Sequence, residues 1–180
     1  MRRMVLAQIL VLAACTVGRV YRNSEYGFSA ALPAGRTACQ KSGLYEHDHG
    51  VGIFLDNGAL DCAYEQESRP YMGVVGEYNA ADYRTAEEAI APLCQKGTAA
   101  VPPPGLVFPH LRSVACRRDI GAARVNITVL AQCCSRPGEQ AEVPDINYIA
   151  WLDTTPERLE ADTAELRDLL NRVEFFKPGQ

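Results

Sequence analysis

The sequence predicts an α+β fold, with a mostly antiparallel sheet and helices packed against it, and three observations support this prediction. Extended apolar segments occupy the first part of the chain. A short helical pattern follows, and after it come further extended segments, two of which form a hairpin pattern around Gly121. An amphipathic helical pattern lies near the C-terminus. Strands and helices in separate runs are typical of this fold class.

Three strands are predicted before the first helix, within residues 26–32, 51–55 and 71–78. Pro33 ends the first of them, and the turn sequence Asp56-Asn57-Gly58 ends the second. Residues 36–48 form a polar stretch between the first two of these strands.

The first helix begins at a capping-box pattern formed by Thr85 and Glu88. Pro92 is expected to kink or end this helix, because the proline ring would clash with the carbonyl group of Glu88. Residues 98–109 follow as a predicted loop, which contains the stiff run Pro102-Pro103-Pro104. The apolar positions of the helix are Ala86, Ala89, Ile90 and Leu93.

The second half of the chain begins with a predicted hairpin of residues 112–119 and 122–134, followed by a strand over residues 146–152. In the final helix, Thr155 is the expected N-cap and Pro156 the first helical residue. Residues 174–176 then form a short extended segment. One face of this helix is apolar and consists of Leu159, Leu166, Leu169, Leu170 and Val173.

The two ends of the predicted α+β region contain motifs that resemble those of PsbP-like domains. Residues 21–29 lead to Leu32-Pro33 and are similar to the family's Tyr-x-Asn approach to a Tyr-Gly-Phe-Ser strand that ends at proline. Thr155-Pro156-Glu157, the amphipathic helix and Val173-Glu174-Phe175-Phe176 are similar to the end of the same domains. The resemblance implies an α/β/α sandwich, and the family includes secreted lipoproteins. No site motif of the family matches, so it implies no binding residue.

The first fifteen residues resemble the signal peptide of a bacterial lipoprotein. Arg2 and Arg3 precede an apolar run over residues 4–14, which is shorter than the roughly 20 residues that span a bilayer. Leu12-Ala13-Ala14-Cys15 resembles the lipobox of that family, in which the signal is cut before the cysteine and the thiol is acylated. The resemblance implies that Cys15 carries a lipid anchor with palmitate among its acyl chains.

These patterns divide the chain into a signal peptide (1–14), a lipidated cysteine with a tether (15–23) and one α+β domain (24–177). Thr16 follows the cysteine where aspartate would favour the inner membrane, so the lipoprotein resemblance implies anchoring in the outer membrane, facing the periplasm. A conventional cut after Gly18 is the alternative, and it would produce a soluble periplasmic or secreted protein.

The charge balance bears on the kind of partner. A net charge of −4 and a pI near 5.4 argue against nucleic acid, which binds basic surfaces. They also argue against direct adhesion to anionic lipid. Membrane association would therefore come from the acyl chains of the anchor.

The cysteine count supports export. Of seven cysteines, six remain in the mature protein whether Cys15 is lipidated or removed with the signal. An even number in an oxidising compartment indicates disulfides, so we expect a disulfide-stapled domain. Six cysteines allow 15 connectivities, among which we favour Cys39–Cys62 and Cys94–Cys116. The disulfide candidates are Cys39, Cys62, Cys94, Cys116, Cys133 and Cys134.

Cys133 and Cys134 close the apolar, strand-like run of residues 125–131. Neighbouring residues of a regular strand point to opposite faces, so these two thiols are expected to have different partners. This expectation is incompatible with both favoured pairings together, since those leave only Cys133 and Cys134 over. A disulfide between the two is the less favoured alternative, because departures from ordinary peptide geometry are costly.

Residues 46–49 read Glu-His-Asp-His and form the cluster densest in metal-ligating side chains. On an extended segment His47 and His49 would face the same way, which suits a divalent metal with a third ligand from elsewhere, such as His110 or a carboxylate. The favoured alternative is a solvated polar stretch, since a lone His-x-His is weak evidence for a metal site.

A catalytic signature is missing from the sequence, which has no Gly-x-Ser-x-Gly, and oxidised cysteines are not nucleophiles. We therefore expect no enzyme. Tyr71, Tyr78 and Tyr83 are candidates for a partner-binding surface, because tyrosine is enriched at protein interfaces. The alternative is that they are half-buried strand residues with hydrated hydroxyl groups.

Together these patterns favour a non-catalytic module that binds an envelope protein or a toxin in the periplasm, for example as an inhibitor or immunity protein. Two alternatives remain open. One is a metal-binding sensor or metal-dependent enzyme that uses His47 and His49. The other is a structural subunit of an envelope assembly.

Overall fold

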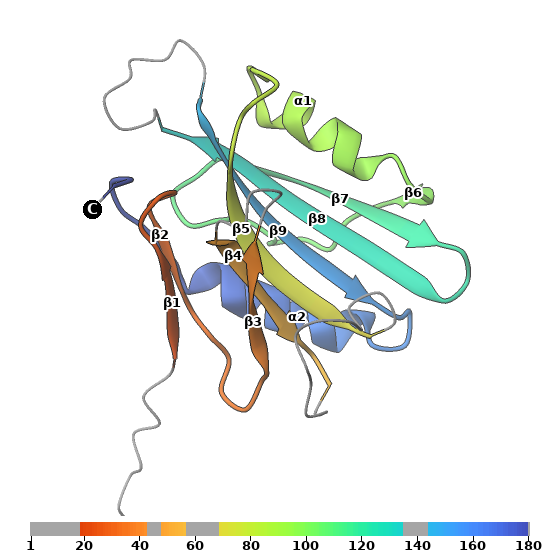
Figure 1. Cartoon of the computed structure of the whole chain (residues 1–180). Coiled ribbons are helices and arrows are strands. Elements are labelled where there is room, and N and C mark those ends of the chain that lie inside the picture. Colours follow the sequence, from red (N-terminus) through yellow and green to blue (C-terminus); the bar gives the residue numbers. More distant parts are fainter. Residues whose placement is uncertain (1–18, 43–47, 57–68, 135–143, 180) are drawn as a thin grey trace, which may run out of the picture.

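Two antiparallel sheets form the framework of the computed structural model, which describes residues 19–42, 48–56, 69–134 and 144–179 (Figure 1). The large sheet has seven strands in the order β3-β4-β5-β9-β8-β7-β6, and the small sheet has the order β1-β2-β10. The large sheet consists of β3 (Ala38–Ser42), β4 (Asp48–Phe54), β5 (Tyr71–Tyr78), β6 (Thr98–Ala100), β7 (Ser113–Ile120), β8 (Arg124–Cys133) and β9 (Ile146–Thr154). The small sheet consists of β1 (Val20–Asn23), β2 (Phe28–Ala31) and β10 (Val173–Phe175).

Helices cover both faces of the large sheet. Ile90 of α1 (Ala86–Ile90) packs against Leu130 of β8, whereas Leu166 of α2 (Leu159–Asn171) packs into the main core with Val129 of the same strand. Since neighbouring strand residues point to opposite faces, the two helices lie on opposite sides (Figure 1). The predicted α+β fold with an α/β/α arrangement is confirmed.

No helix of the described residues is long and apolar enough to cross a membrane. The helices are α1 (Ala86–Ile90), the 3-10 helix η1 (Ala91–Cys94) and α2 (Leu159–Asn171).

Aromatic side chains join the two sheets in the main core. Tyr148 of β9 lies 5.9 Å from Phe28 of β2 and 4.6 Å from Phe175 of β10, measured between ring centroids. Phe108, from the segment before β7, packs against Phe175 at 6.0 Å. The Tyr148 hydroxyl donates a hydrogen bond to the carbonyl oxygen of Tyr26 at 2.6 Å. The small sheet is therefore held firmly against the large one.

Three strands occur where the sequence predicts none. β1 lies within the expected tether of residues 15–23, so the folded region includes Val20. β3 lies within the polar stretch of residues 36–48, and β6 within the expected loop of residues 98–109. All three are the outer strands of their sheets, and they pair with β2, β4 and β7. Pairing with the strand that follows in the chain, rather than local sequence preference, produces these strands.

The final helix begins later than expected. α2 starts at Leu159, and the prediction of Thr155 as N-cap and Pro156 as first helical residue is wrong. A turn precedes the helix, closed by a hydrogen bond from the Arg158 N–H to the Thr155 carbonyl at 3.1 Å. Arg158 then pairs with the buried Asp162 through two bonds of 2.9 and 3.0 Å. The need to satisfy this buried carboxylate explains the arrangement.

The first helix agrees with its prediction. The Thr85 hydroxyl accepts a hydrogen bond from the Glu88 N–H at 3.2 Å, which caps α1. The α-helix ends at Ile90, and the segment that contains Pro92 tightens into η1. The proline therefore ends the regular α-helix, as its missing N–H group requires.

Cys94 and Cys116 are bonded, as favoured from the sequence. Cys133 and Cys134 are bonded to each other, so the expectation of separate partners is wrong. β8 ends at Cys133, and Cys134 has a φ of +60°, so the alternation of a regular strand does not extend to it. Cys39 is also disulfide-bonded, whereas its expected partner Cys62 lies outside the described residues, as does Cys15.

Candidate interaction surface

Exposed apolar side chains are concentrated in one part of the described chain. Five large hydrophobic residues are exposed, and four of them fall between residues 93 and 120. Single exposed hydrophobic residues are ordinary on a protein surface, whereas a contiguous apolar patch marks an interaction site, so the positions of these residues in the fold are decisive. The exposed fractions are 44% for Leu93, 85% for Val101, 49% for Val107 and 39% for Ile120; the fifth residue, Val20 in β1, is 64% exposed.

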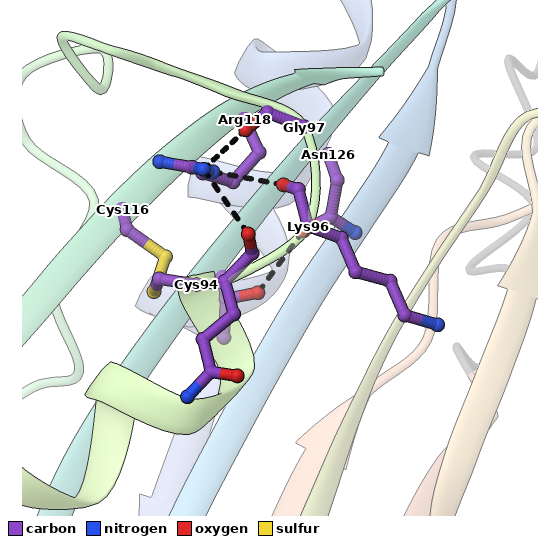
Figure 2. Close-up of a disulfide and its surroundings, with 8 residues drawn as sticks. Cys94, Lys96, Gly97, Cys116, Arg118 and Asn126 are labelled. Atoms are coloured by element: carbon purple, nitrogen blue, oxygen red, sulfur yellow. Dashed lines mark hydrogen bonds between the residues drawn. A yellow bond between two sulfur atoms is a disulfide. The ribbon is translucent and has the colours of Figure 1, made fainter.

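A disulfide fixes η1 against β7. It joins Cys94, the last residue of η1, to Cys116 in β7, with 6.2 Å between the two Cα atoms (Figure 2). Leu93 directly precedes Cys94 and is held at the same place. Ile120 lies four residues beyond Cys116 and therefore on the same face of the strand. Ile120 therefore lies on the face of β7 against which the disulfide holds η1, the helix that carries Leu93.

Strand β6 adds the most exposed of these side chains. β6 pairs with β7 so that Ala100 lies opposite Arg117. Val101 follows Ala100, and the same register places it level with Cys116. We refer to Leu93, Val101 and Ile120, together with β6, as the β6 surface.

Arg118 holds the segment between η1 and β6 in place (Figure 2). Its guanidinium donates to the carbonyl oxygens of Lys96 at 2.8 Å and Gln95 at 3.3 Å, and also to that of Gly97. Gly97 has a φ of +79°, and a Cβ atom there would lie 2.6 Å from the carbonyl oxygen of Asp119. This turn therefore requires glycine. These contacts tie the segment before β6 to β7, and a segment held in this way loses less conformational entropy on association.

Ion pairs lie at both ends of β7. Arg112 pairs with Glu87 of α1 at 2.5 Å, and Arg124 pairs with Asp153 at 3.3 Å. The backbone N–H of Glu87 and then Arg112 lower the pKa of the Glu87 carboxyl group. Both pairs are at least partly exposed, so they contribute little to stability. An apolar centre with charged groups around it is the usual composition of a protein interface.

The structure describes only part of the predicted metal cluster of residues 46–49. His49 is half-buried, and its ring packs against Tyr26 with 5.2 Å between the centroids. The Tyr26 hydroxyl oxygen lies 3.4 Å from the nearer ring nitrogen, and burial raises the pKa of Tyr26 above its usual value. His47 lies outside the described residues, among which no group of three ligating side chains could hold a metal. A metal site at His47 and His49 remains a prediction.

The three candidate tyrosines do not form one surface. Tyr71 and Tyr78 are the first and last residues of β5, and an odd separation along a strand places them on opposite faces. Tyr71 packs against Trp151 with 5.6 Å between centroids, and Tyr78 against Tyr26 with 5.0 Å. Tyr83 lies just before α1, where its carbonyl oxygen accepts hydrogen bonds from the Asn79 and Gln132 side chains.

Sequence reasoning missed the β6 surface, although it predicted the disulfide beneath it. Val101 lies in a segment predicted as a loop, where an apolar residue is easily overlooked. The sequence feature that could have identified Val101 as exposed is its position directly before three consecutive prolines. Prolines cannot donate backbone hydrogen bonds, so this segment could not continue as an inner strand that buries the valine.

The sequence matches no protein-family model and no curated protein. A crystal structure of LpqN from Mycobacterium tuberculosis, described as involved in cell envelope biogenesis, matches with a TM-score of 0.54 at 8% identity. The match covers 91% of this chain and 88% of LpqN. The chain is similar in fold to LpqN. At this identity the likeness concerns the fold alone.

A solution structure of PsbP (CyanoP) from the cyanobacterium Synechocystis sp. PCC 6803 also matches, with a TM-score of 0.49 at 10% identity. The match covers 92% of this chain and 99% of the PsbP chain. PsbP-like domains are the family that both ends of the sequence resemble. The described topology agrees with the α/β/α sandwich that this resemblance implied.

Proposed function

We propose that this protein is a non-catalytic envelope module that binds another protein through the β6 surface and is anchored to the outer membrane by a lipid on Cys15. The observation that carries this proposal is Val101, an aliphatic side chain that is 85% exposed beside the edge strand β6. An open strand edge presents unpaired backbone groups to which another chain can add, and Val101 places apolar surface beside that edge. LpqN, which is similar in fold, is described as involved in cell envelope biogenesis.

The two edges of the large sheet support this role. β1, from which the chain runs back toward Cys15, contacts β4 near one edge of the sheet. β6 lies at the other edge, about 29 Å from β3 at the usual strand spacing (Figure 1). An anchor at Cys15 would therefore hold the molecule at one side and present the β6 surface at the other.

The edge of β6 also indicates how a partner would bind. β6 pairs only with β7 among the described strands, so its outer backbone groups are available to an extended segment of another protein. Apolar side chains of that segment would contact Leu93 and Val101. An inhibitor or immunity protein that blocks a secreted toxin is one form of this role.

A pull-down from the envelope fraction of the source cells tests this proposal with three baits: the wild-type protein, Val101→Asp and Val20→Asp. Both valines are exposed, so neither aspartate disturbs the core, and Val20 serves as the matched control at the opposite edge. We expect a stoichiometric partner with the wild-type and Val20→Asp baits and its loss with Val101→Asp. Equal capture by all three baits, or no stoichiometric partner for the wild-type protein, would overturn the proposal.

A further inference from the structure

The Cys133–Cys134 disulfide joins two neighbouring residues at the end of β8. Cys133 is half-buried and lies opposite Ile146 of β9. Cys134 follows the strand and is exposed. The bond is thus accessible from solvent on the Cys134 side, and it connects no second strand or helix.

This disulfide differs from the other described one in what it can stabilise. The stabilisation that a disulfide gives grows with the length of the loop it closes. The sequence separation is 1 for Cys133–Cys134 and 22 for Cys94–Cys116. Opening the bond between neighbours should therefore leave the fold intact, and cross-linking does not explain why it is there.

The backbone at Cys134 is strained. Its φ of +60° lies in the left-handed region, which residues other than glycine rarely adopt. Such conformations occur where the surroundings hold them, and they are concentrated at functional sites. Exposed or strained disulfides have more oxidising potentials than ordinary structural ones and react with thiols.

We propose that Cys133–Cys134 is a thiol–disulfide exchange site that accepts electrons from a protein dithiol. One thiolate of the dithiol attacks the Sγ of the exposed Cys134. The bond between the two cysteines breaks, and its electron pair leaves on the Cys133 Sγ, which takes up a proton. The second thiolate of the donor then attacks the mixed disulfide and releases Cys134, which is protonated in turn. The donor is oxidised to a disulfide, and the cysteine pair is reduced to two thiols.

Backbone hydrogen bonds hold this site independently of the sulfur atoms. The Asp145 N–H donates to the Cys134 carbonyl at 2.9 Å, and the Asn79 N–H donates to the Asp145 carbonyl at 2.7 Å. The buried Asn79 side chain donates to the carbonyls of Tyr83 and Pro144, at 2.8 Å each. These hydrogen bonds do not depend on the disulfide, so the backbone at Cys134 is expected to keep its position when the cysteine pair is reduced.

The test is a titration of the folded, disulfide-bonded protein with dithiothreitol, followed by acid quenching, alkylation and peptide mass spectrometry. Cys94–Cys116 is the internal control. We expect Cys133 and Cys134 to be half alkylated at a dithiothreitol concentration at least about tenfold lower than the control pair, with an unchanged far-UV circular dichroism spectrum. Reduction of both pairs at the same concentration, or reduction of Cys133–Cys134 only where the spectrum is lost, would overturn the proposal.

Two single variants test which sulfur atom reacts. Cys133→Ser leaves the exposed Cys134 thiol, and Cys134→Ser leaves the half-buried Cys133 thiol. With oxidised glutathione, we expect the Cys133→Ser protein to form a mixed disulfide at least about tenfold faster, since access governs the rate of exchange. Equal rates, or a faster reaction of the Cys134→Ser protein, would contradict the proposed order of attack.

Discussion

Cys94 and Cys116 are bonded across 6.2 Å between their Cα atoms, and this bond fastens η1 to β7 under the β6 surface. The disulfide and the Arg118 guanidinium both tie the short segment of residues 94–97 to β7 (Figure 2). The segment from Leu93 to Val101 is thus fastened to β7, although its helix, η1, has only four residues. A binding surface benefits from such rigidity, because less conformational freedom is lost when a partner binds.

Removing this disulfide should destabilise the protein. In the variant Cys94→Ala with Cys116→Ala, the unfolded chain regains the freedom of a loop with a sequence separation of 22. We expect the free energy of unfolding to fall by about 3 kcal/mol, measured by urea denaturation. The matched control, Cys133→Ala with Cys134→Ala, should lose less than about 1 kcal/mol. Equal losses in the two double variants would contradict this account of the two disulfides.

The Arg158–Asp162 pair at the start of α2 should contribute far more to the free energy of unfolding than the second i,i+4 pair of the helix, Asp168–Arg172. Asp162 is 1% exposed, and Arg158→Ala would remove its cationic partner. We expect a loss of about 3 kcal/mol in the free energy of unfolding. Arg172, which lies 3.8 Å from the exposed Asp168, is the control, and Arg172→Ala should cost less than about 0.5 kcal/mol. Similar effects of the two substitutions would show that burial of Asp162 is not decisive.

Stability should fall at alkaline pH. Burial raises the pKa of Tyr71 and of Tyr148 to about 12, whereas tyrosines in an unfolded chain titrate near pH 10. Between about pH 10 and 12 the folded protein therefore binds more protons than the unfolded chain, so unfolding becomes more favourable as the pH rises. Thermal unfolding across this range should show a smaller decline for Tyr148→Phe than for the wild-type protein. An identical decline would exclude burial of the Tyr148 hydroxyl as a cause.

The lipid anchor is tested by Cys15→Ser. The lipobox resemblance predicts that this variant leaves the membrane fraction, because no acyl chain can be attached. Immunoblots of separated membrane and soluble fractions measure the distribution, and circular dichroism checks that the variant is folded. A variant that stays in the membrane fraction would contradict the lipobox interpretation and favour an uncleaved anchor.

The inner strands of the large sheet could be predicted from the sequence, and its outer strands could not. The prediction for residues 71–78 matches β5, and the hairpin around Gly121 matches β7 and β8. These segments are long, apolar and bounded by clear turn signals. The outer strands β3 and β6, like β1 of the small sheet, are short, and they form through hydrogen bonds to the next strand along the chain, which local patterns do not reveal.

The site was predictable only in part. Cys94–Cys116 was one favoured pairing among 15 connectivities that the cysteine count leaves open, whereas the bond between Cys133 and Cys134 depends on where β8 ends. The candidate tyrosines Tyr71 and Tyr78 share a strand, and alternation alone already separates their faces. Val101 could be recognised only after the register of β6 had shown it at an exposed edge.

The central claim, that the β6 surface binds the partner, is tested most directly by hydrogen–deuterium exchange of the protein alone and in complex with the captured partner. The account predicts slower exchange on binding for the backbone amides of residues 98–101, and unchanged exchange for residues 20–23 at the opposite edge. Unchanged exchange at residues 98–101, with protection confined to other segments, would contradict it.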